Sequence, residues 1–224
     1  MKNIIYILTF IITTTAIAQS TNNVAFEKQK LKQALAYGDK VTAASSMYSI
    51  IAMEGAKSSY KDSLAYLYFN SGNYVSTFLV TNDILKNKPE NVELLEIHAI
   101  SLESMGALKK SGETYNKLVA KTKSNYHAYK LAGIQLSTNN PTEAYASIKK
   151  ADQLADNGKM KINFQVNKNF NQNIDLKAAI AYLEGIIALK LEKTAEAKVS
   201  FERAIKIFPE FVLAKGKLSG IKTE

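Results

Sequence analysis

The sequence predicts an all-α protein, a right-handed α-solenoid of stacked helix-turn-helix repeats. Two observations lead to this prediction: turn-forming residues recur at a fixed interval, and apolar residues between them follow helical spacing. Gly38, Gly72 and Gly106 lie 34 residues apart, and one more step reaches Asn140. Gly and Asn accept the positive φ of a tight turn, and a fixed period of this size is typical of stacked-repeat proteins.

The composition favours helices around a sizeable core. The 224 residues are 46% hydrophobic, with 10 Gly, only 3 Pro and no Cys. Few helix breakers interrupt the chain, and the lack of cysteine excludes thiol catalysis and thiolate metal sites. The net charge of +9 comes almost entirely from lysine, because Arg203 is the only arginine. Since reading of bases and phosphates relies on Arg, we expect a solvated basic surface and no nucleic-acid partner.

The first residues, MKNIIYILTFIITTTAIAQS, predict a bacterial signal peptide over residues 1–18. A basic residue precedes an apolar core at residues 4–12, and Ala16 and Ala18 give the small-x-small pattern of a cleavage site after Ala18. Cleavage would leave residues 19–224 as one periplasmic or secreted helical repeat domain without a membrane span. The alternative is a retained anchor, although the apolar run is shorter than the ~20 residues of a spanning helix.

Each period is predicted to contain two amphipathic helices. The unit over residues 58–91 has one helix before Gly72 and one after it, ended by Pro89. Its inward positions are Leu64, Ala65, Tyr68, Tyr74, Thr77, Thr81 and Ile84. Spacings of three and four place these side chains on one face of each helix. Small residues are predicted where two helices approach closely, at Ala65, Ala99, Gly133 and Gly185.

This arrangement resembles the tetratricopeptide repeat family. The best match is the last unit, which has the family's small, small, aromatic, small and proline residues at Gly185, Ala197, Phe201, Ala204 and Pro209. Units near residues 24–57, 92–125 and 126–155 follow the pattern more loosely, and the last of these is one residue short, since Ala144 and Ala151 fall a step early. The resemblance covers most of the chain in about five units. After Pro209, a helix with lysines on its outer side is expected to cap the array.

An irregular insertion at about residues 156–177 breaks the period. It is rich in Asn and Lys, with Phe164, Val166 and Phe170 alternating among polar residues. Two interpretations remain open. It is a longer loop or lengthened helix pair whose aromatic residues pack on neighbouring units, or it is a functional excursion at the rim of a binding face.

Residues with catalytic potential are few and scattered. The chain has two histidines, His98 and His127, and no glycine-rich phosphate loop. His98 falls at an interior helical position, where a packed histidine is the simpler interpretation. We therefore expect no enzyme activity, no cofactor and no metal site.

In the tetratricopeptide repeat family, the first helix of each unit lines a concave groove. The resemblance assigns partner contact in such a groove to Tyr66, Phe69, Glu96, Ile100, His127, Lys130, Ile134, Tyr182 and Ile186. Apolar and aromatic residues with a few charges suit a peptide segment. We expect a non-catalytic protein-interaction scaffold of the cell envelope. The alternative is a cell-wall glycan or polysaccharide-binding protein that uses its lysine-rich face and the 156–177 insertion.

Overall fold

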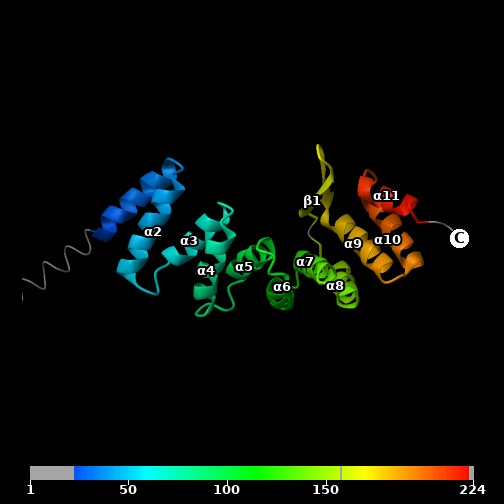
Figure 1. Ribbon diagram of the computed structural model, residues 1–224, viewed down its shortest axis with the longest axis horizontal. Helices are drawn as coiled ribbons and strands as arrows, with labels where there is room; N and C mark the ends of the chain where they lie inside the picture. Colours follow the sequence, from blue (N-terminus) through cyan, green and yellow to red (C-terminus); the bar gives the residue numbers. More distant parts are fainter. Residues whose placement is uncertain (1–22, 157, 222–224) are drawn as a thin grey trace, which may run out of the picture. The chain divides into compact units, whose positions relative to one another are not determined.

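The computed structural model describes residues 23–156 and 158–221 (Figure 1). The predicted signal peptide, with Ala16 and Ala18, lies outside these described residues. The chain divides into two compact units, one ending at Ile97 and one beginning at His98. Both units are built of stacked helical hairpins, so the predicted all-α solenoid is confirmed.

The first unit contains two helical hairpins and the start of a third. Its helices are one over residues 23–36, α2 (Lys40–Glu54), α3 (Tyr60–Phe69), α4 (Tyr74–Leu85) and the first part of α5 (Val92–Ser104). Helix α3 packs against both α2 and α4. Two apolar clusters fill the spaces between helices, one around Ile50 and Leu64 and the other around Ala65, Ile84 and Leu94.

The second unit continues the hairpins and adds a small sheet. It contains the end of α5, α6 (Leu108–Thr122), α7 (Asn125–Ser137), α8 (Pro141–Gln153), β1 (Lys161–Asn167), β2 (Phe170–Asp175), α9 (Leu176–Lys190), α10 (Thr194–Ile207) and α11 (Val212–Ser219). From α6 to α11, each helix packs against the next one along the chain. Helix α11 is the predicted terminal helix, and Phe211 and Ala214 anchor it in the core.

Five hairpin turns share one backbone geometry. Their central residues are Gly38, Gly72, Gly106, Asn139 and Glu192, with φ between 60° and 76°. In each turn, this residue donates its N–H to the carbonyl three residues earlier, and the next residue donates to the carbonyl five residues earlier, at 2.8–3.2 Å. These two bonds satisfy the last free carbonyls of the preceding helix. The predicted repeat is therefore confirmed at equivalent corners.

The fourth unit is one residue shorter than the 34-residue period, as the early Ala144 and Ala151 indicate in the sequence. Asn139, not Asn140, takes the left-handed conformation. The small residue at the helix contact is accordingly Ala132, which is fully buried, and not Gly133. At Gly185 the prediction holds, because an added Cβ would lie only 2.6 Å from the Phe201 ring. Helices α9 and α10 therefore approach so closely that a larger residue there needs rearrangement.

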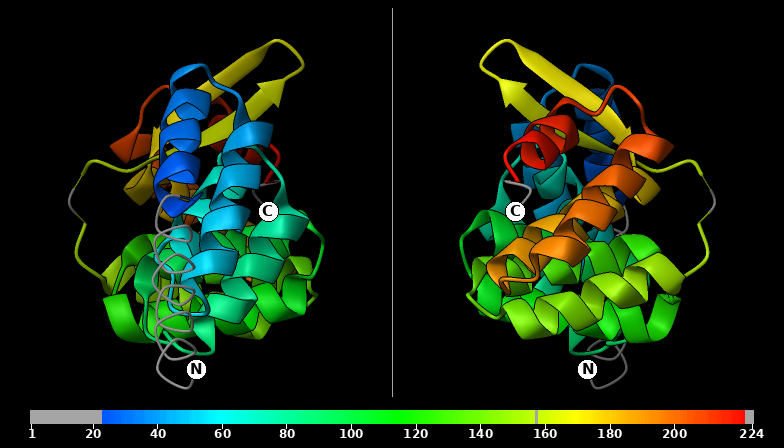
Figure 2. Two further views of the ribbon diagram at one scale, coloured as in Figure 1. Left: turned by 90° about the vertical axis from the view of Figure 1, so that its left-hand side faces the viewer. Right: turned by 90° about the vertical axis from the view of Figure 1, so that its right-hand side faces the viewer.

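The insertion forms an antiparallel β-hairpin, where the sequence predicted a loop or a lengthened helix pair. Lys161 lies opposite Asp175 and Phe164 opposite Gln172, with an irregularity between Gln165 and Asn167. The half-buried and exposed side chains alternate along β1, which is the period of a strand. Figure 2 shows the two strands, in yellow, reaching past the ends of the second unit's helices.

Candidate functional site

The turns fix which residues are equivalent along the first helices of the hairpins. The predicted groove positions lie 13, 10, 6 and 3 residues before the turn residue in the units whose turns are at Gly72 and Gly106. Because the fourth turn residue is Asn139, the equivalent residues there are Tyr126, Tyr129, Gly133 and Leu136. The sequence prediction named the residue after each of these, including His127, Lys130 and Ile134. These three assignments were out of register by one position.

The register error explains why two of the predicted contact residues are buried. His127 is 6% exposed and Ile134 is 5% exposed. The Nδ1 atom of His127 lies 2.8 Å from the Thr122 hydroxyl oxygen, and its ring contacts Tyr115 and Tyr126. Both residues therefore pack mainly against the helices around them.

In the first unit, the predicted positions form an accessible polar and aromatic face on α3 and the start of α5. Tyr66 is 37% exposed, whereas Phe69 is half-buried and packs edge-on against Tyr74, with the two ring centroids 6.1 Å apart. The pKa of Tyr66 is raised, first by burial and then by the charges of Glu93, Asp62 and Glu96. The negative charges of three carboxylates thus act on one exposed phenol. We name Asp62, Tyr66, Glu93 and Glu96 the α3–α5 face.

In the second unit, the predicted residues Ile100 and Lys130 are half-buried. The Lys130 ammonium lies 2.8 Å from Glu103 Oε1 and 5.9 Å from the centre of the Tyr115 ring. The lysine is therefore held between a carboxylate and an aromatic face. A ligand carboxylate that used Lys130 would have to displace Glu103.

On α9, the predicted contact residue Tyr182 is covered by Phe164 of the β-hairpin and by Phe211. The Tyr182 ring centroid lies 5.6 Å from Phe164 of the hairpin and 4.9 Å from Phe211. Burial raises the pKa of the Tyr182 hydroxyl. Ile186, one turn further, packs half-buried against the Phe201 cluster. The last unit therefore offers less free surface than the sequence predicted, because the hairpin lies on it.

Two tyrosines on α7 were missed by the sequence analysis. Tyr126 and Tyr129 occupy groove positions once Asn139 is recognised as the turn residue. Tyr129 packs against the cluster of Ile174 and its neighbours, and its pKa is raised by burial and then by Tyr126 and Tyr182. The early Ala144 and Ala151 were the available signal, since they show in the sequence that this unit is short.

Each unit has a cavity at an equivalent place, between the second helix of one hairpin and the first helix of the next. The cavity between α2 and α3 is about 400 Å³ and includes Ala44, Tyr48 and Leu67 in its lining. The one between α6 and α7 is about 480 Å³ and is lined at equivalent positions by Gly112, Asn116 and Ile134. Because the positions match, the cavities follow from the repeat geometry, and their linings differ in chemistry.

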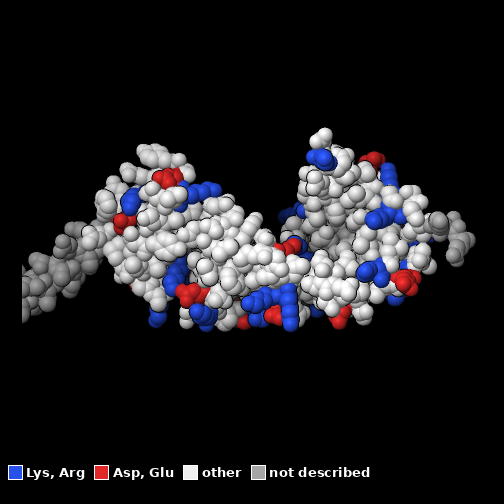
Figure 3. All heavy atoms as spheres, in the orientation of Figure 1, with Lys and Arg blue, Asp and Glu red and all other residues white. Residues whose placement is uncertain are grey.

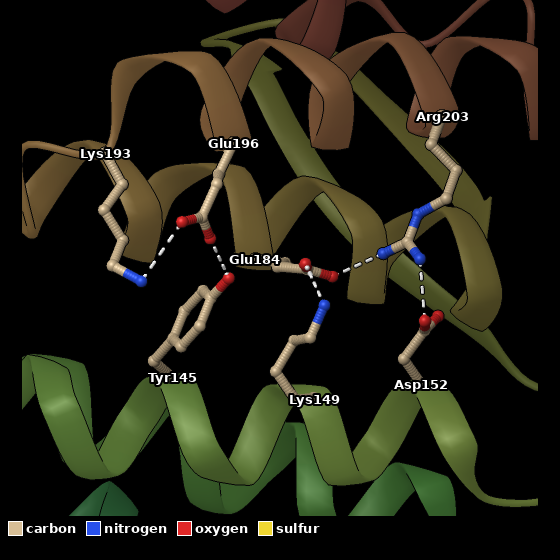
Figure 4. A network of polar contacts seen from close by, with 7 residues as sticks. All are labelled: Tyr145, Lys149, Asp152, Glu184, Lys193, Glu196 and Arg203. Atoms are coloured by element: carbon tan, nitrogen blue, oxygen red, sulfur yellow. Dashed lines mark hydrogen bonds and ion pairs between the residues drawn. The ribbon is translucent and has the colours of Figure 1, made fainter.

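A network of charged side chains joins α8, α9 and α10 (Figure 4). Glu184 is 5% exposed and accepts hydrogen bonds from Lys149, at 3.1 Å, and from Arg203. Arg203 also bonds to Asp152 at 2.7 Å. Each of these four groups has a charged partner within the network, so the only arginine of the chain is used in helix packing. This network is structural in character.

A neighbouring pair in the same figure links α8 to α10 at the surface. Tyr145 donates its hydroxyl to Glu196, which also pairs with Lys193 at 3.2 Å (Figure 4). The hydrogen bond raises the pKa of Tyr145 to about 12 and, with Lys193, lowers the pKa of Glu196. These shifts arise from mutual pairing and do not indicate a reactive group.

Metal-binding clusters and membrane-spanning helices are both absent from the described ranges. Within residues 23–156 and 158–221, no three His, Asp or Glu side chains gather in a way that could hold a metal ion. Over the same ranges, no helix combines the length and apolar character that a membrane span needs. On the face shown in Figure 3, basic and acidic atoms lie interspersed in each unit.

The turns, the small residues at helix contacts and the accessible first helices define a tetratricopeptide-repeat fold. The solved structure of YrrB, described as a tetratricopeptide repeat protein with an unusual peptide-binding site, has a TM-score of 0.69 and 14% identity, covering 92% of this chain and 97% of its own. MamA (41-end) from Desulfovibrio magneticus RS-1 has a TM-score of 0.64 and 12% identity, covering 85% and 97%. A further MamA crystal structure has a TM-score of 0.57 and 18% identity, covering 70% and 76%.

These identities show a common fold. No protein-family model matches the sequence, and the search of curated proteins finds no match.

Proposed function

We propose that this protein is a non-catalytic scaffold that binds a peptide or protein segment along the first helices of its hairpins. The tetratricopeptide-repeat fold supports the proposal, as does the structural likeness to YrrB, which is described as peptide-binding. The observation that carries it is the α3–α5 face, where exposed Tyr66 lies among Asp62, Glu93 and Glu96.

The chemistry of this face suits a segment that bears a Lys or Arg next to an apolar residue. The phenol ring offers apolar surface and an aromatic face for a cation, while the carboxylates attract positive charge. Asp62 is itself paired with Lys88 at 2.7 Å, and Glu96 is half-buried. We expect Glu93, which is exposed, to contribute most of the electrostatic attraction.

The other predicted residues differ in how accessible they are to a partner. Ile100 belongs to the corresponding surface of the second unit and can contact a partner there, while Lys130 needs its pair with Glu103 to open first. His127, Ile134 and Tyr182 act through packing, because they are buried or covered. Phe69 and Ile186 support the helices from half-buried positions.

A photo-crosslinking experiment tests the proposed face. A benzophenone amino acid placed at Tyr66 should capture a discrete partner in the native host, and the same group at Tyr37 should not. Tyr37 is the matched control, because it is 84% exposed and lies at the turn of the first hairpin. The partner segment, once purified, should bind the Tyr66→Ala variant at least ~10-fold more weakly, equivalent to about 1.4 kcal/mol.

The control variant Tyr37→Ala should keep the wild-type affinity, and circular dichroism should show unchanged helix content in both variants. Equal affinity of the Tyr66→Ala variant and the wild type would remove the α3–α5 face from the binding site.

The cell-envelope location is also part of the proposal and depends on the predicted signal peptide. We expect mass spectrometry of the protein from its host to show an N-terminus at Gln19 in a periplasmic or culture fraction. A full-length chain in the membrane fraction would instead support the retained anchor.

The glycan-binding alternative receives less support from the side-chain positions. Phe164 of the insertion points to Tyr182 and Phe211, so it is not a platform for a sugar ring. Co-sedimentation with purified cell-wall material tests the alternative directly. Sedimentation at low salt that raised salt reverses would favour it over the scaffold.

A further inference from the structure

The cavity between α6 and α7 contains polar side chains that the repeat geometry does not require. Both helices belong to the second unit and pack against each other (Figure 1). The cavity volume of about 480 Å³ lies in the range of small-molecule sites. Apolar residues such as Leu108 and Leu131 line it, together with two charged side chains and three amides.

The two charged residues of this cavity are Lys109 and Glu113. They lie three and seven residues after the turn glycine, and the equivalent cavity between α2 and α3 has Val41 and Ser45 at these positions. In the part of the chain that the structure describes, neither charged side chain makes an ion pair or a hydrogen bond. Packing of the repeat therefore does not explain why charges stand here.

The amides of this cavity take the place of a closed pair of tyrosines. Between α2 and α3, the hydroxyl oxygens of Tyr48 and Tyr68 lie 3.1 Å apart. Asn116 and Gln135 occupy the equivalent positions between α6 and α7. Among the described residues, these two amides do not bond to each other, and the Oε1 atom of Gln135 is buried without a donor. A ligand that supplies an N–H to this oxygen is therefore favoured.

We propose that this cavity binds a dipeptide-sized zwitterion, with its carboxylate at Lys109 and its ammonium at Glu113. The two residues are four positions apart on α6, which is about 6 Å along the helix axis. The ends of an extended dipeptide are separated by about 7 Å. One cation and one anion at this spacing complement both ends of the same ligand.

The amide side chains suit the peptide bond between those ends. Each amide carries a donor and an acceptor, as a peptide bond does. Gln135 Oε1 accepts the ligand N–H, and the Asn116 amide donates to the ligand carbonyl. Asn140 donates its own amide to Thr138, at 3.0 Å from the hydroxyl oxygen, and so offers the ligand only an acceptor. No described residue that lines the cavity is aromatic, so stacking on a sugar ring is not available.

The start of α6 favours the carboxylate at the Lys109 end. The N-cap residue Ala107 provides no side-chain hydrogen bond, and the first turn contains no acidic residue. The free N–H groups of this turn and the helix dipole therefore add positive potential next to Lys109. Glu113, one turn further along, lies beyond the range of this effect.

The cavity is separate from the proposed partner face. Ile134 and Gln135 line it from α7, whereas the groove positions of this helix are Tyr126 and Tyr129. At 100° per residue, these two pairs lie on roughly opposite sides of α7. The inference therefore stands or falls independently of the α3–α5 face.

Titration with three alanine dipeptides, followed by NMR of the ¹⁵N-labelled protein, tests the proposal. Free alanyl-alanine should shift amide resonances of α6 and α7. N-acetyl-alanyl-alanine lacks the ammonium and alanyl-alanine amide lacks the carboxylate, so each should bind about 3- to 5-fold more weakly, as expected for one partly exposed ion pair.

Substitutions show which residue reads which end. Glu113→Gln should abolish the preference over the N-acetyl form, and Lys109→Gln should abolish the preference over the amide form. Lys110→Gln is the matched control, because this exposed neighbour does not line the cavity and the charge change is the same. It should keep both preferences. Gln135→Leu should weaken all three dipeptides alike, since each retains the peptide bond.

Three results would overturn the proposal. One is the absence of shifts in α6 and α7 at about 20 mM alanyl-alanine, a concentration that populates even an inefficient ligand of this size. Another is equal affinity for the free and the blocked dipeptides, which would show that the charges are not read. The third is an equal loss of affinity in Lys109→Gln and Lys110→Gln, which would indicate a general effect of surface charge.

Discussion

At the scale of single residues, the hairpin turns show how backbone conformation defines the repeat. Gly38, Gly72 and Gly106 accept the left-handed conformation without steric cost, but Asn139 and Glu192 adopt it too. For a residue such as Glu192 this conformation costs roughly 1–2 kcal/mol. The turn forms nonetheless, because two backbone hydrogen bonds and the packing of both helices require it.

The turn glycines lead to a stability prediction. Gly72→Ala should lower the free energy of unfolding by about 1 kcal/mol, since φ is 70° and the surrounding space is empty, so that only backbone strain is added. Gly216→Ala is the control, because this glycine lies inside α11 with nothing near its Cβ position. It should stabilise by roughly 0.5–1 kcal/mol. Urea unfolding measures both, and equal effects would refute the explanation.

The buried histidine leads to a prediction about pH. His98 is 9% exposed, and burial, with a smaller contribution from Lys117, lowers its pKa. The unfolded chain therefore takes up a proton at about pH 6.5 while the folded chain does not. Stability should be full above this pH and should fall as the pH drops below it, down to the lowered pKa of the folded state.

Thermal unfolding between pH 5 and 8 measures this effect, and His98→Gln should make the profile flatter than in the wild type. The carboxylates with lowered pKa values, such as Glu54 and Asp83, lose their contribution only at more acidic pH. Identical slopes for wild type and variant would show that His98 is not responsible.

At the scale of elements, the β-hairpin does two things that a loop could not. It places Phe164 on Tyr182, and it positions Gln172 at the start of α11. The Gln172 amide donates to the Glu210 carbonyl at 2.6 Å and accepts from the Val212 N–H at 3.0 Å. Because α11 has no side-chain cap of its own, the hairpin supplies one of its N-terminal hydrogen bonds.

Removal of this contact should loosen the terminal helix. Gln172→Ala is expected to cost roughly 1–2 kcal/mol for the two hydrogen bonds and to speed amide hydrogen exchange in α11. Asn171→Ala, one residue earlier and exposed, serves as the control and should leave α11 unchanged. If both variants exchange alike, α11 does not depend on the hairpin.

The groove shows how far residue patterns could predict a site. On α3 and α5 the predicted residues include accessible ones such as Tyr66, because the 34-residue spacing is strict there. On α7 the prediction was wrong by one residue, so it named the buried His127 in place of the half-buried Tyr126. A helix turns by about 100° per residue, so this small error exchanges one face for another.

At the scale of the molecule, helix packing mainly joins helices that are adjacent in the sequence. Each helix of the second unit from α6 onward packs against the next, so stability is expected to be transmitted mainly between adjacent hairpins. The charged network of Glu184 strengthens one such step, between α8, α9 and α10. The effect of breaking it should therefore decrease with distance along the chain.

Hydrogen exchange on Glu184→Ala tests this expectation. The loss of a buried carboxylate should cost about 3 kcal/mol, at the low end for a broken buried pair because Lys149 and Arg203 stay partly solvated. Protection should fall most in α8–α10 and least in the helix over residues 23–36. Glu196→Ala is the matched control, since it removes an exposed carboxylate of the neighbouring pair. Uniform loss of protection would contradict the nearest-neighbour picture.

The sequence by itself determined the repeat, the helix pairs and the terminal helix, because turn conformation and helical spacing are local properties of the chain. Tertiary structure alone decided that residues 161–175 form strands and that Phe164 covers Tyr182. These features depend on contacts between residues far apart in the chain, since a strand of alternating residues is stable only when a neighbouring surface buries its apolar side.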